Sequence, residues 1–250
     1  MPMENKEDKS TSNSDFTIEA EGVTKSFGHH LVLRGIDLKL KRGEFLTIFG
    51  RNGAGKTTFL KILATLLRPS FGSVYMAGLD LSKNSMDIRR KIGVVSHQTF
   101  LYDELTAYEN IKFYGKMYDV PKLDERAREL IAKVGLASCI HEKVNTFSRG
   151  MQQRLTIARA MVHNPSILLL DEPETGLDQY ASAMLQDLLT TFEAEKRTVV
   201  MTSHSLERGL QMGNRVVILS EGKIACDVAS KDMSVSGLQE LYQRYTGEEQ

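Results

Sequence analysis

The sequence predicts an α/β fold built on a largely parallel sheet. Short apolar runs typical of strands alternate with stretches of helical periodicity, the order expected when helices pack on a mostly parallel sheet. Between about residues 104 and 162 the strand pattern disappears and only helical periodicity remains. We therefore expect an α/β core that carries a helical insertion.

The strands are predicted from apolar or alternating runs bounded by turn residues. Residues 36–40 alternate apolar with polar side chains, which indicates a strand with one buried face. A turn at Arg42-Gly43 leads into a continuous apolar run. The predicted strands cover residues 36–40, 45–49, 73–76, 92–95, 167–171, 198–202, 216–219 and 224–228.

Helices are predicted where apolar residues recur at three- and four-residue steps. One runs over residues 56–67 and is ended by Pro69, and another follows the last strand. Within the insertion we expect one helix with an apolar face, a second over 124–134, and a third that starts near Ser148. The face of the first contains Tyr108, Ile111, Tyr114, Gly115 and Tyr118.

Composition narrows the possible functions. Lys plus Arg and Asp plus Glu are 32 each, so there is no basic excess for nonspecific nucleic-acid binding. No apolar run approaches the roughly 18 residues of a membrane span, so a membrane role would need another chain. Residues 1–15 are polar, without the apolar region of a signal peptide. We expect a disordered tail there and one ordered domain over residues 16–250.

The strongest motif is Gly50-Arg51-Asn52-Gly53-Ala54-Gly55-Lys56-Thr57, followed by Thr58. It fits G-x-x-x-x-G-K-[ST] and lies between a predicted strand and a predicted helix, the context of a phosphate-binding P-loop. Glycines let the backbone wrap a phosphate closely, and N–H groups at a helix start face the anion. Lys56 would reach the β- and γ-phosphates, and the Thr57 hydroxyl would bind Mg²⁺.

Two carboxylates, Asp171 and Glu172, end the apolar run 167–171. At the carboxyl edge of a parallel sheet Asp171 would lie beside the P-loop and bind Mg²⁺ through water. Glu172 would then orient or deprotonate the attacking water. Acidic turn residues end many buried strands, so the P-loop upstream is what favours this interpretation.

The segment Phe147-Ser148-Arg149-Gly150-Met151-Gln152-Gln153-Arg154 opens a predicted helix ahead of these carboxylates. Here the chain resembles the ABC ATPase family, whose motif reads L-S-G-G-Q followed by glutamines and a basic residue. In that family the serine hydroxyl and the helix-start amides cap the γ-phosphate bound to the other protomer. Ser148 and Gly150 match, whereas Arg149 and Met151 depart from the pattern.

The resemblance, which covers nearly the whole chain from Phe16, implies further roles. Gln98 resembles the glutamine that contacts Mg²⁺ and senses the membrane partner, and His204 resembles the histidine that contacts the γ-phosphate. Asp178 is similar to the aspartate of the loop that crosses the dimer interface. Phe27 resembles the aromatic residue that stacks on adenine, with a core-packed phenylalanine as the alternative.

The family also implies an architecture, partners and a location. We expect a P-loop NTPase core with a mostly parallel sheet, an antiparallel β part and a helical subdomain over about 104–162. The chain would bind ATP and Mg²⁺, form a homodimer, and serve an integral membrane transporter subunit from the cytoplasmic face of the inner membrane. Residues 63–69 and 148–154 resemble those of exporter ATPases, most of all the haem exporter ATPase of cytochrome c biogenesis, so we expect export, with haem as the first candidate cargo. Drug- or lipid-type exporters and a non-transport scaffold ATPase remain alternatives.

A cluster of aromatic residues follows Gln98. We expect Tyr108, Tyr114 and Tyr118 to pack inside the insertion. Phe100, Leu101 and Tyr102 precede its first helix, and we expect them to form an exposed apolar patch where the family docks a helix of the membrane subunit.

Overall fold

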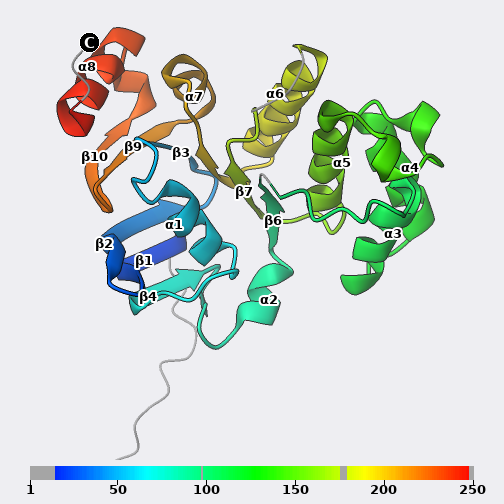
Figure 1. Ribbon diagram of the computed structural model, residues 1–250, viewed down its shortest axis with the longest axis horizontal. Coiled ribbons are helices and arrows are strands. Elements are labelled where there is room, and N and C mark those ends of the chain that lie inside the picture. The colour runs from blue at the N-terminus through cyan, green and yellow to red at the C-terminus, as the bar shows by residue number, and fades with distance from the viewer. Residues whose placement is uncertain (1–14, 97, 175–178, 248–250) are drawn as a thin grey trace, which may run out of the picture.

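The chain folds around two sheets (Figure 1). The computed structural model describes residues 15–96, 98–174 and 179–247, without the side chains of 179 and 180; the predicted tail lies almost wholly outside this range. One sheet has the order β2-β1-β4-β5 with antiparallel pairing, which is the expected antiparallel part. Its strands are β1 Phe16–Phe27, β2 His30–Lys41, β4 Phe71–Met76 and β5 Leu79–Asp80.

The second sheet has the order β10-β9-β3-β8-β7-β6. The strands β9, β3, β8, β7 and β6 pair in parallel, and only β10 runs antiparallel, beside β9. The predicted, largely parallel sheet is therefore confirmed. Its strands are β3 Phe45–Phe49, β6 Ile92–Val95, β7 Ile167–Asp171, β8 Thr198–Thr202, β9 Arg215–Ser220 and β10 Lys223–Ala229.

The central strands β3, β7 and β8 are buried at every position. A parallel strand covered on both faces favours apolar side chains at most positions, which explains why these strands are mostly apolar. Within this sheet Thr202 of β8 lies opposite both Ile48 of β3 and Asp171 of β7. The carboxyl ends of the three strands therefore reach the same edge, and the loops that leave them start side by side.

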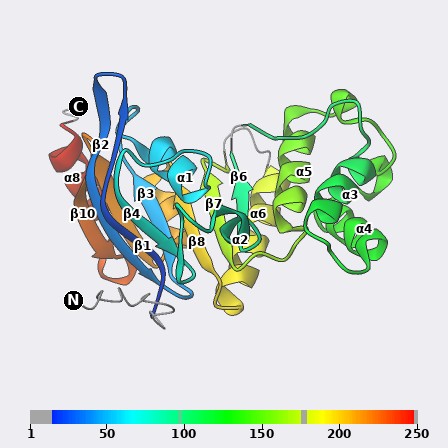
Figure 2. The ribbon, with the colours of Figure 1, turned by 90° about the horizontal axis from the view of Figure 1, so that it is seen from below.

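Helices surround these sheets and include a separate helical group. Figures 1 and 2 show α3, α4 and α5 together at the end of the molecule remote from β9 and β10. A capping box in which Thr106 and Glu109 bond reciprocally starts α3. The helices are α1 Lys56–Leu63, α2 Ser85–Arg89, α3 Ala107–Met117, α4 Leu123–Lys133, α5 Arg149–Met161, α6 Gln179–Ala194, α7 Leu206–Met212 and α8 Val235–Thr246.

Helix α1 is shorter than predicted, because it ends at Leu63 instead of continuing to residue 67. Thr65 adopts a left-handed conformation with φ of 60°. Its N–H donates to Ile62 O, and the next N–H, of Leu66, donates to Lys61 O, each at 2.9 Å. This pair of bonds closes the helix in a Schellman motif, an ending usually signalled by glycine.

Two large apolar cores hold the molecule together. One joins the antiparallel sheet to α1 and one face of the parallel sheet, and the other fills the space among α3, α4, α5, α6 and the opposite face. Tyr108, Tyr114 and Tyr118 pack against this second core, as predicted. Within the described ranges no helix has the length and apolarity needed to cross a membrane.

Candidate functional site

The glycine-rich loop joins the end of β3 to the start of α1. Gly50 has φ of 153° and Gly55 has φ of 105°. An added Cβ would lie 2.3 Å from Leu219 O at Gly50 and 2.6 Å from Leu33 Cδ2 at Gly55. Both positions therefore require glycine, because a side chain would collide with the packed strand and hairpin beside the loop.

Lys56 folds back over this loop. Its Nζ donates to Gly50 O at 2.6 Å and to Arg51 O at 3.2 Å. Burial lowers the pKa of Lys56, and the charges of Glu172 and Asp171 oppose that shift. The buried amine of Lys56 thus bonds to carbonyl oxygens of the loop. It can exchange these carbonyls for the oxygens of an anionic ligand.

A cavity of about 310 Å³ opens over the loop and the start of α1. Among the predicted phosphate-binding residues, Gly50 and Ala54 do not line it; the N–H of Ala54 closes the loop by donating to Arg51 O at 3.1 Å. Sequence analysis missed three of the lining residues: His30 and Val32 of β2, and Arg51. The full lining is His30, Val32, Arg51, Asn52, Gly53, Gly55, Lys56, Thr57, Thr58 and Glu172.

The predicted carboxylates meet the loop at the sheet edge. Thr57 Oγ1 donates to Asp171 Oδ1 at 3.1 Å, and Thr202 Oγ1 donates to the same oxygen at 2.8 Å. Asp171 is buried. Glu172 follows in a left-handed conformation with φ of 50°, and its N–H donates to Thr202 Oγ1 at 3.0 Å. Thr202 is thus the link between the two carboxylate residues.

His204 lies where the sequence predicts, after β8. Its Nε2 is 2.5 Å from Glu172 Oε1, and the imidazole is half-exposed while the carboxylate is largely buried. The structure therefore brings together residues from three loops: Lys56 and Thr57, Asp171 and Glu172, and His204. Their shared location follows from the parallel register, which aligns the ends of β3, β7 and β8.

Other predicted residues lie outside this cavity. Gln98 is exposed, and its carbonyl accepts from Ser96 Oγ at 2.9 Å. Phe27 is 46% exposed, so the alternative that it packs in the core is wrong. It pairs across the β1–β2 hairpin with the cavity residue His30. Asp178 lies outside the described residues.

Ser148 and Gly150 are separate from the cavity in one chain. Ser148 is exposed and caps α5 by accepting from Met151 N at 3.2 Å. A Cβ at Gly150 would meet nothing within 4 Å, so the fold of the single chain does not require glycine there. Neither residue lines the cavity, and α1 and α5 lie apart in both ribbon views (Figures 1 and 2).

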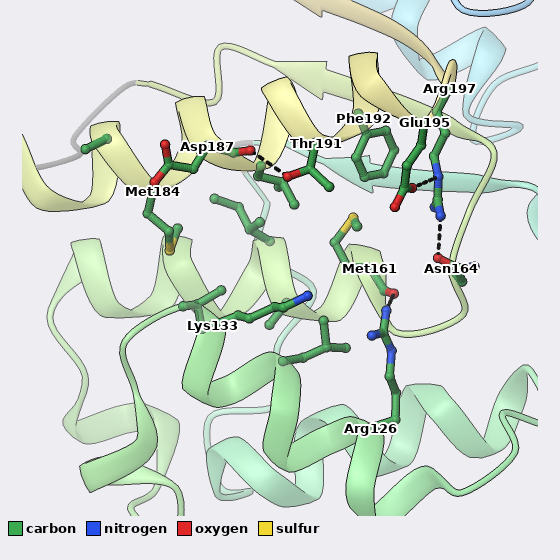
Figure 3. A pocket seen from close by; sticks show the side chains of 16 residues that line it. Arg126, Lys133, Met161, Asn164, Met184, Asp187, Thr191, Phe192, Glu195 and Arg197 are labelled. Atoms are coloured by element: carbon green, nitrogen blue, oxygen red, sulfur yellow. Dashed lines mark hydrogen bonds and ion pairs between the residues drawn. The ribbon is translucent and has the colours of Figure 1, made fainter.

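A second cavity, of about 420 Å³, lies among α4, α5 and α6. Figure 3 shows Met161, Met184 and Phe192 within it, while charged side chains stand around its edge. Arg126 donates to Met161 O at 3.1 Å and Arg197 to Asn164 Oδ1 at 2.8 Å. None of the residues predicted for function lines this cavity.

The two-sheet α/β fold and the loop between β3 and α1 define a P-loop nucleoside triphosphatase. The family model for ABC transporters matches residues 33–175, more than half of the chain. The chain therefore belongs to the ABC transporter family. It is an ATP-binding subunit of that family, and its enzymatic activity is ATP hydrolysis.

Three similar proteins place the chain within the family. The ABC transporter ATP-binding protein NatA of Bacillus subtilis is 35% identical over 77% of this chain and 79% of its own length. The linearmycin resistance ATP-binding protein LnrL of the same organism is 31% identical over 90% of this chain and 77% of its own. A dimeric post-hydrolysis structure of the ATP-binding cassette MJ0796, bound to ADP and Pi, is 30% identical with a TM-score of 0.79 over 85% of this chain and 98% of that one.

Proposed function

We propose that two copies of the chain bind two ATP molecules at a shared interface and drive export through a separate integral membrane protein. The proposal rests on one observation: the predicted site residues lie in two separate places on the chain. The cavity at the P-loop holds one half, and Ser148, which is exposed, and Gly150, which is partly exposed, lie elsewhere on the same chain. A similar cassette is dimeric, which supports completion of each site by the partner.

The residues at the loop fit a nucleoside triphosphate with Mg²⁺. The Thr57 hydroxyl and the Asp171 carboxylate, 3.1 Å apart, are oxygen ligands of the kind Mg²⁺ takes beside substrate phosphates. We assign both to the metal, together with Gln98. When bound, the metal would neutralise charge on the phosphates. Lys56 would exchange its loop carbonyls for phosphate oxygens, with Asn52, Gly53, Gly55 and Thr58 around it.

Glu172 is the residue that we assign to water activation. Its carboxylate borders the cavity, and its left-handed backbone, fixed by Thr202, aims it away from the strand. A carboxylate in this position can accept a proton from water as that water attacks the γ-phosphate. His204 contacts Glu172 in the present structure, and we propose that it turns to the γ-phosphate when ATP is bound.

The second half of each site would come from the start of the partner's α5. The Ser148 hydroxyl and the first amides of the helix form an anion-binding end. Open space at Gly150 lets phosphate approach the backbone. Arg149 is exposed beside them, where its charge favours the same anion.

The cargo that we propose is a drug- or antibiotic-type compound. The supporting observation is the linearmycin resistance protein, whose similarity extends over 90% of this chain. The haem exporter of cytochrome c biogenesis, placed first on sequence resemblance, draws no support from the relatives reported above, so drug-type export takes its place. Without a spanning helix in its described residues, the chain would act as a peripheral subunit at the cytoplasmic face of the membrane.

Deleting the gene in its host tests this cargo assignment. We expect the deletion strain to become more sensitive to at least one antibiotic in a broad panel. Wild-type chain should restore resistance, and the Lys56→Ala chain should not. Unchanged resistance with loss of haem-stained c-type cytochromes would overturn the assignment in favour of haem export. If both resistance and cytochromes are unchanged, the result would indicate lipid export or a non-transport role for the ATPase.

A further inference from the structure

Two carboxylates join the loop after β7 to the loop after β8. The strands are parallel neighbours, with Asp171 opposite Thr202, so the segments that leave them start side by side. Glu172 contacts His204, and Glu174, two residues later, accepts a hydrogen bond from the hydroxyl of Ser203. Ser203 and His204, which are adjacent in the loop after β8, are thus each bonded to a carboxylate from the loop after β7.

Ser203 is the buried anchor of the segment that carries His204. Only 1% of Ser203 is exposed, whereas His204 is exposed. The Ser203 hydroxyl accepts from the N–H of Ser205 at 3.0 Å, and its own N–H donates to Ile48 O at 3.4 Å. Since these bonds hold the residues on both sides of His204, they fix the backbone from which the imidazole reaches Glu172.

Glu174 is an unusual choice for holding a serine hydroxyl. Its Oε1 accepts a hydrogen bond from the Ser203 hydroxyl, but its buried Oε2 has no hydrogen-bond partner among the described residues. A carboxylate oxygen that is buried without a hydrogen-bond partner is unfavourable, and a neutral acceptor would serve a purely structural bond. What the charge adds is a stronger, shorter hydrogen bond, which restricts Ser203 more tightly.

We propose that Glu174 is a positioning residue for ATP hydrolysis, holding His204 in register with Glu172 through Ser203. The proposal rests on the role of His204 in the proposed function. Glu174 does not line the nucleotide cavity, so its effect would pass through the segment 203–205. A small displacement of a reacting group lowers turnover strongly without changing substrate affinity, and this separates positioning from binding.

The test measures ATP turnover and binding of a non-hydrolysable ATP analogue in the full chain. Glu174→Ala and Ser203→Ala should each lower kcat about tenfold, with the analogue Kd within about twofold of wild type. The double variant should be no slower than Ser203→Ala, because Ser203→Ala already removes the hydrogen bond to Glu174 together with the bond from Ser205 N. Glu174→Gln keeps an acceptor and should retain clearly more turnover than Glu174→Ala. Glu207→Ala, an exposed change on the adjoining helix α7, is the matched control and should stay within about twofold of wild type.

Repeating Glu174→Ala in a His204→Ala background, by single-turnover assay, decides the route of the effect. If Glu174 acts through His204, the second change should add less than about twofold there. An equal loss in both backgrounds, or equal loss for Glu174→Gln and Glu174→Ala, would overturn the proposal while the ATPase assignment stands. If His204→Ala turns over ATP as the wild type does, His204 has no role in hydrolysis, and the proposal for Glu174 is then wrong as well. Should Glu174→Ala fail to fold, Ser203→Ala carries the same comparison.

Discussion

His204 Nε2 lies 2.5 Å from Glu172 Oε1, so the carboxylate proposed to activate water is engaged by the residue proposed to meet the γ-phosphate. A carboxylate oxygen that binds an imidazole N–H is a poorer proton acceptor for water. We therefore expect His204 to leave Glu172 when a γ-phosphate arrives, which ties release of the base to the presence of substrate. Glu172 itself stays in place, because its backbone is fixed by Thr202 Oγ1 at 3.0 Å.

Replacing Glu172 with glutamine tests the catalytic assignment. Glu172→Gln keeps the shape and the hydrogen-bonding reach of the side chain but removes its basicity, so ATP should still bind while turnover falls by at least about 100-fold. Two ATP molecules should then remain trapped between two chains, visible as a stable dimer by size-exclusion chromatography with light scattering. Turnover like that of the wild type would refute the assignment.

Mixing two inactive chains tests the shared site. A Lys56→Ala chain lacks the amine at the P-loop, and a Ser148→Arg chain lacks the cap offered to its partner. Their heterodimer has one site with both defects and one intact site, so up to about half of the wild-type ATPase per dimer should return. Each variant alone is the control. Heterodimers that form and stay inactive would show that the sites are not shared in this way or must act together.

Thr202 offers a stability prediction at the site. Its buried hydroxyl accepts from Glu172 N and donates to Asp171 Oδ1. Thr202→Val preserves the shape but removes the hydrogen bonds of the hydroxyl to Glu172 N and Asp171 Oδ1, so the free energy of unfolding should fall by roughly 1–3 kcal/mol. Urea denaturation measures this. Thr190→Val, an exposed change on α6 whose hydroxyl donates to Gln186 O, should shift the free energy of unfolding by less than about 0.5 kcal/mol. Equal effects of the two variants would contradict the hydrogen-bond argument.

Most of the parallel sheet was predictable because each buried strand is a mostly apolar run with a clear end. The same holds for the P-loop and for Asp171, since the motif and the carboxyl edge of the sheet constrain one another. Thr202 was missed because a threonine at a strand end looks like an ordinary β-branched strand residue. It becomes informative only through the register that sets it opposite both Ile48 and Asp171.

Tertiary contacts that no local pattern reveals explain the remaining differences. Helix α1 ends at Leu63 because Thr65 takes the left-handed position that glycine usually fills. The hairpin residues His30 and Val32 reach the nucleotide cavity from the other sheet, a contact set by how the two sheets pack. Helices α2, α6 and α7 were not predicted, and two of them, at five and seven residues, are too short for periodicity to be decisive.

His163 should make stability depend on pH. Burial lowers its pKa from 6.5 to about 4, and Nδ1 has no partner among the described residues. Between pH 6.5 and pH 4 the unfolded chain binds a proton at His163 that the native chain does not. The contribution of neutral His163 to the free energy of unfolding is therefore complete above pH 6.5 and falls as the pH drops towards 4. The contribution lost between pH 7 and pH 5 is about 2 kcal/mol.

Comparison with His163→Gln isolates this contribution, because glutamine can still donate to Ile92 O, the partner of His163 Nε2. Urea denaturation at pH 7 and pH 5 should show a loss in wild type that exceeds the loss in His163→Gln by about 2 kcal/mol. The exposed His29→Gln should behave as wild type does. Parallel losses in wild type and His163→Gln would mean that His163 titrates normally in the folded chain.

The aromatic residues after Gln98 are our candidate for contact with the membrane subunit. Phe100 is 39% exposed, Tyr102 48% and Phe113 39%, and the rings of Tyr102 and Phe113 meet edge to face with centroids 4.9 Å apart. Leu101, by contrast, packs against the core, so the expected patch contains Phe113 in its place. Exposed neighbouring rings beside the Gln98 loop suit an apolar partner helix.

The backbone of this patch does not depend on its exposed rings. Buried Asn110 accepts from Tyr102 N at 2.8 Å and donates to Tyr102 O at 3.0 Å, and the Tyr114 hydroxyl donates to Phe100 O. The double variant Phe100→Ser/Tyr102→Ser should therefore fold, keep its basal ATPase within about twofold, and lose binding to vesicles that contain the membrane subunit. Phe71→Ser/Tyr75→Ser makes the same two changes at exposed positions of β4 and should bind as wild type does. Retained binding by the first variant would exclude this patch as the docking surface, and its unfolding would mean that the two rings contribute to the core after all.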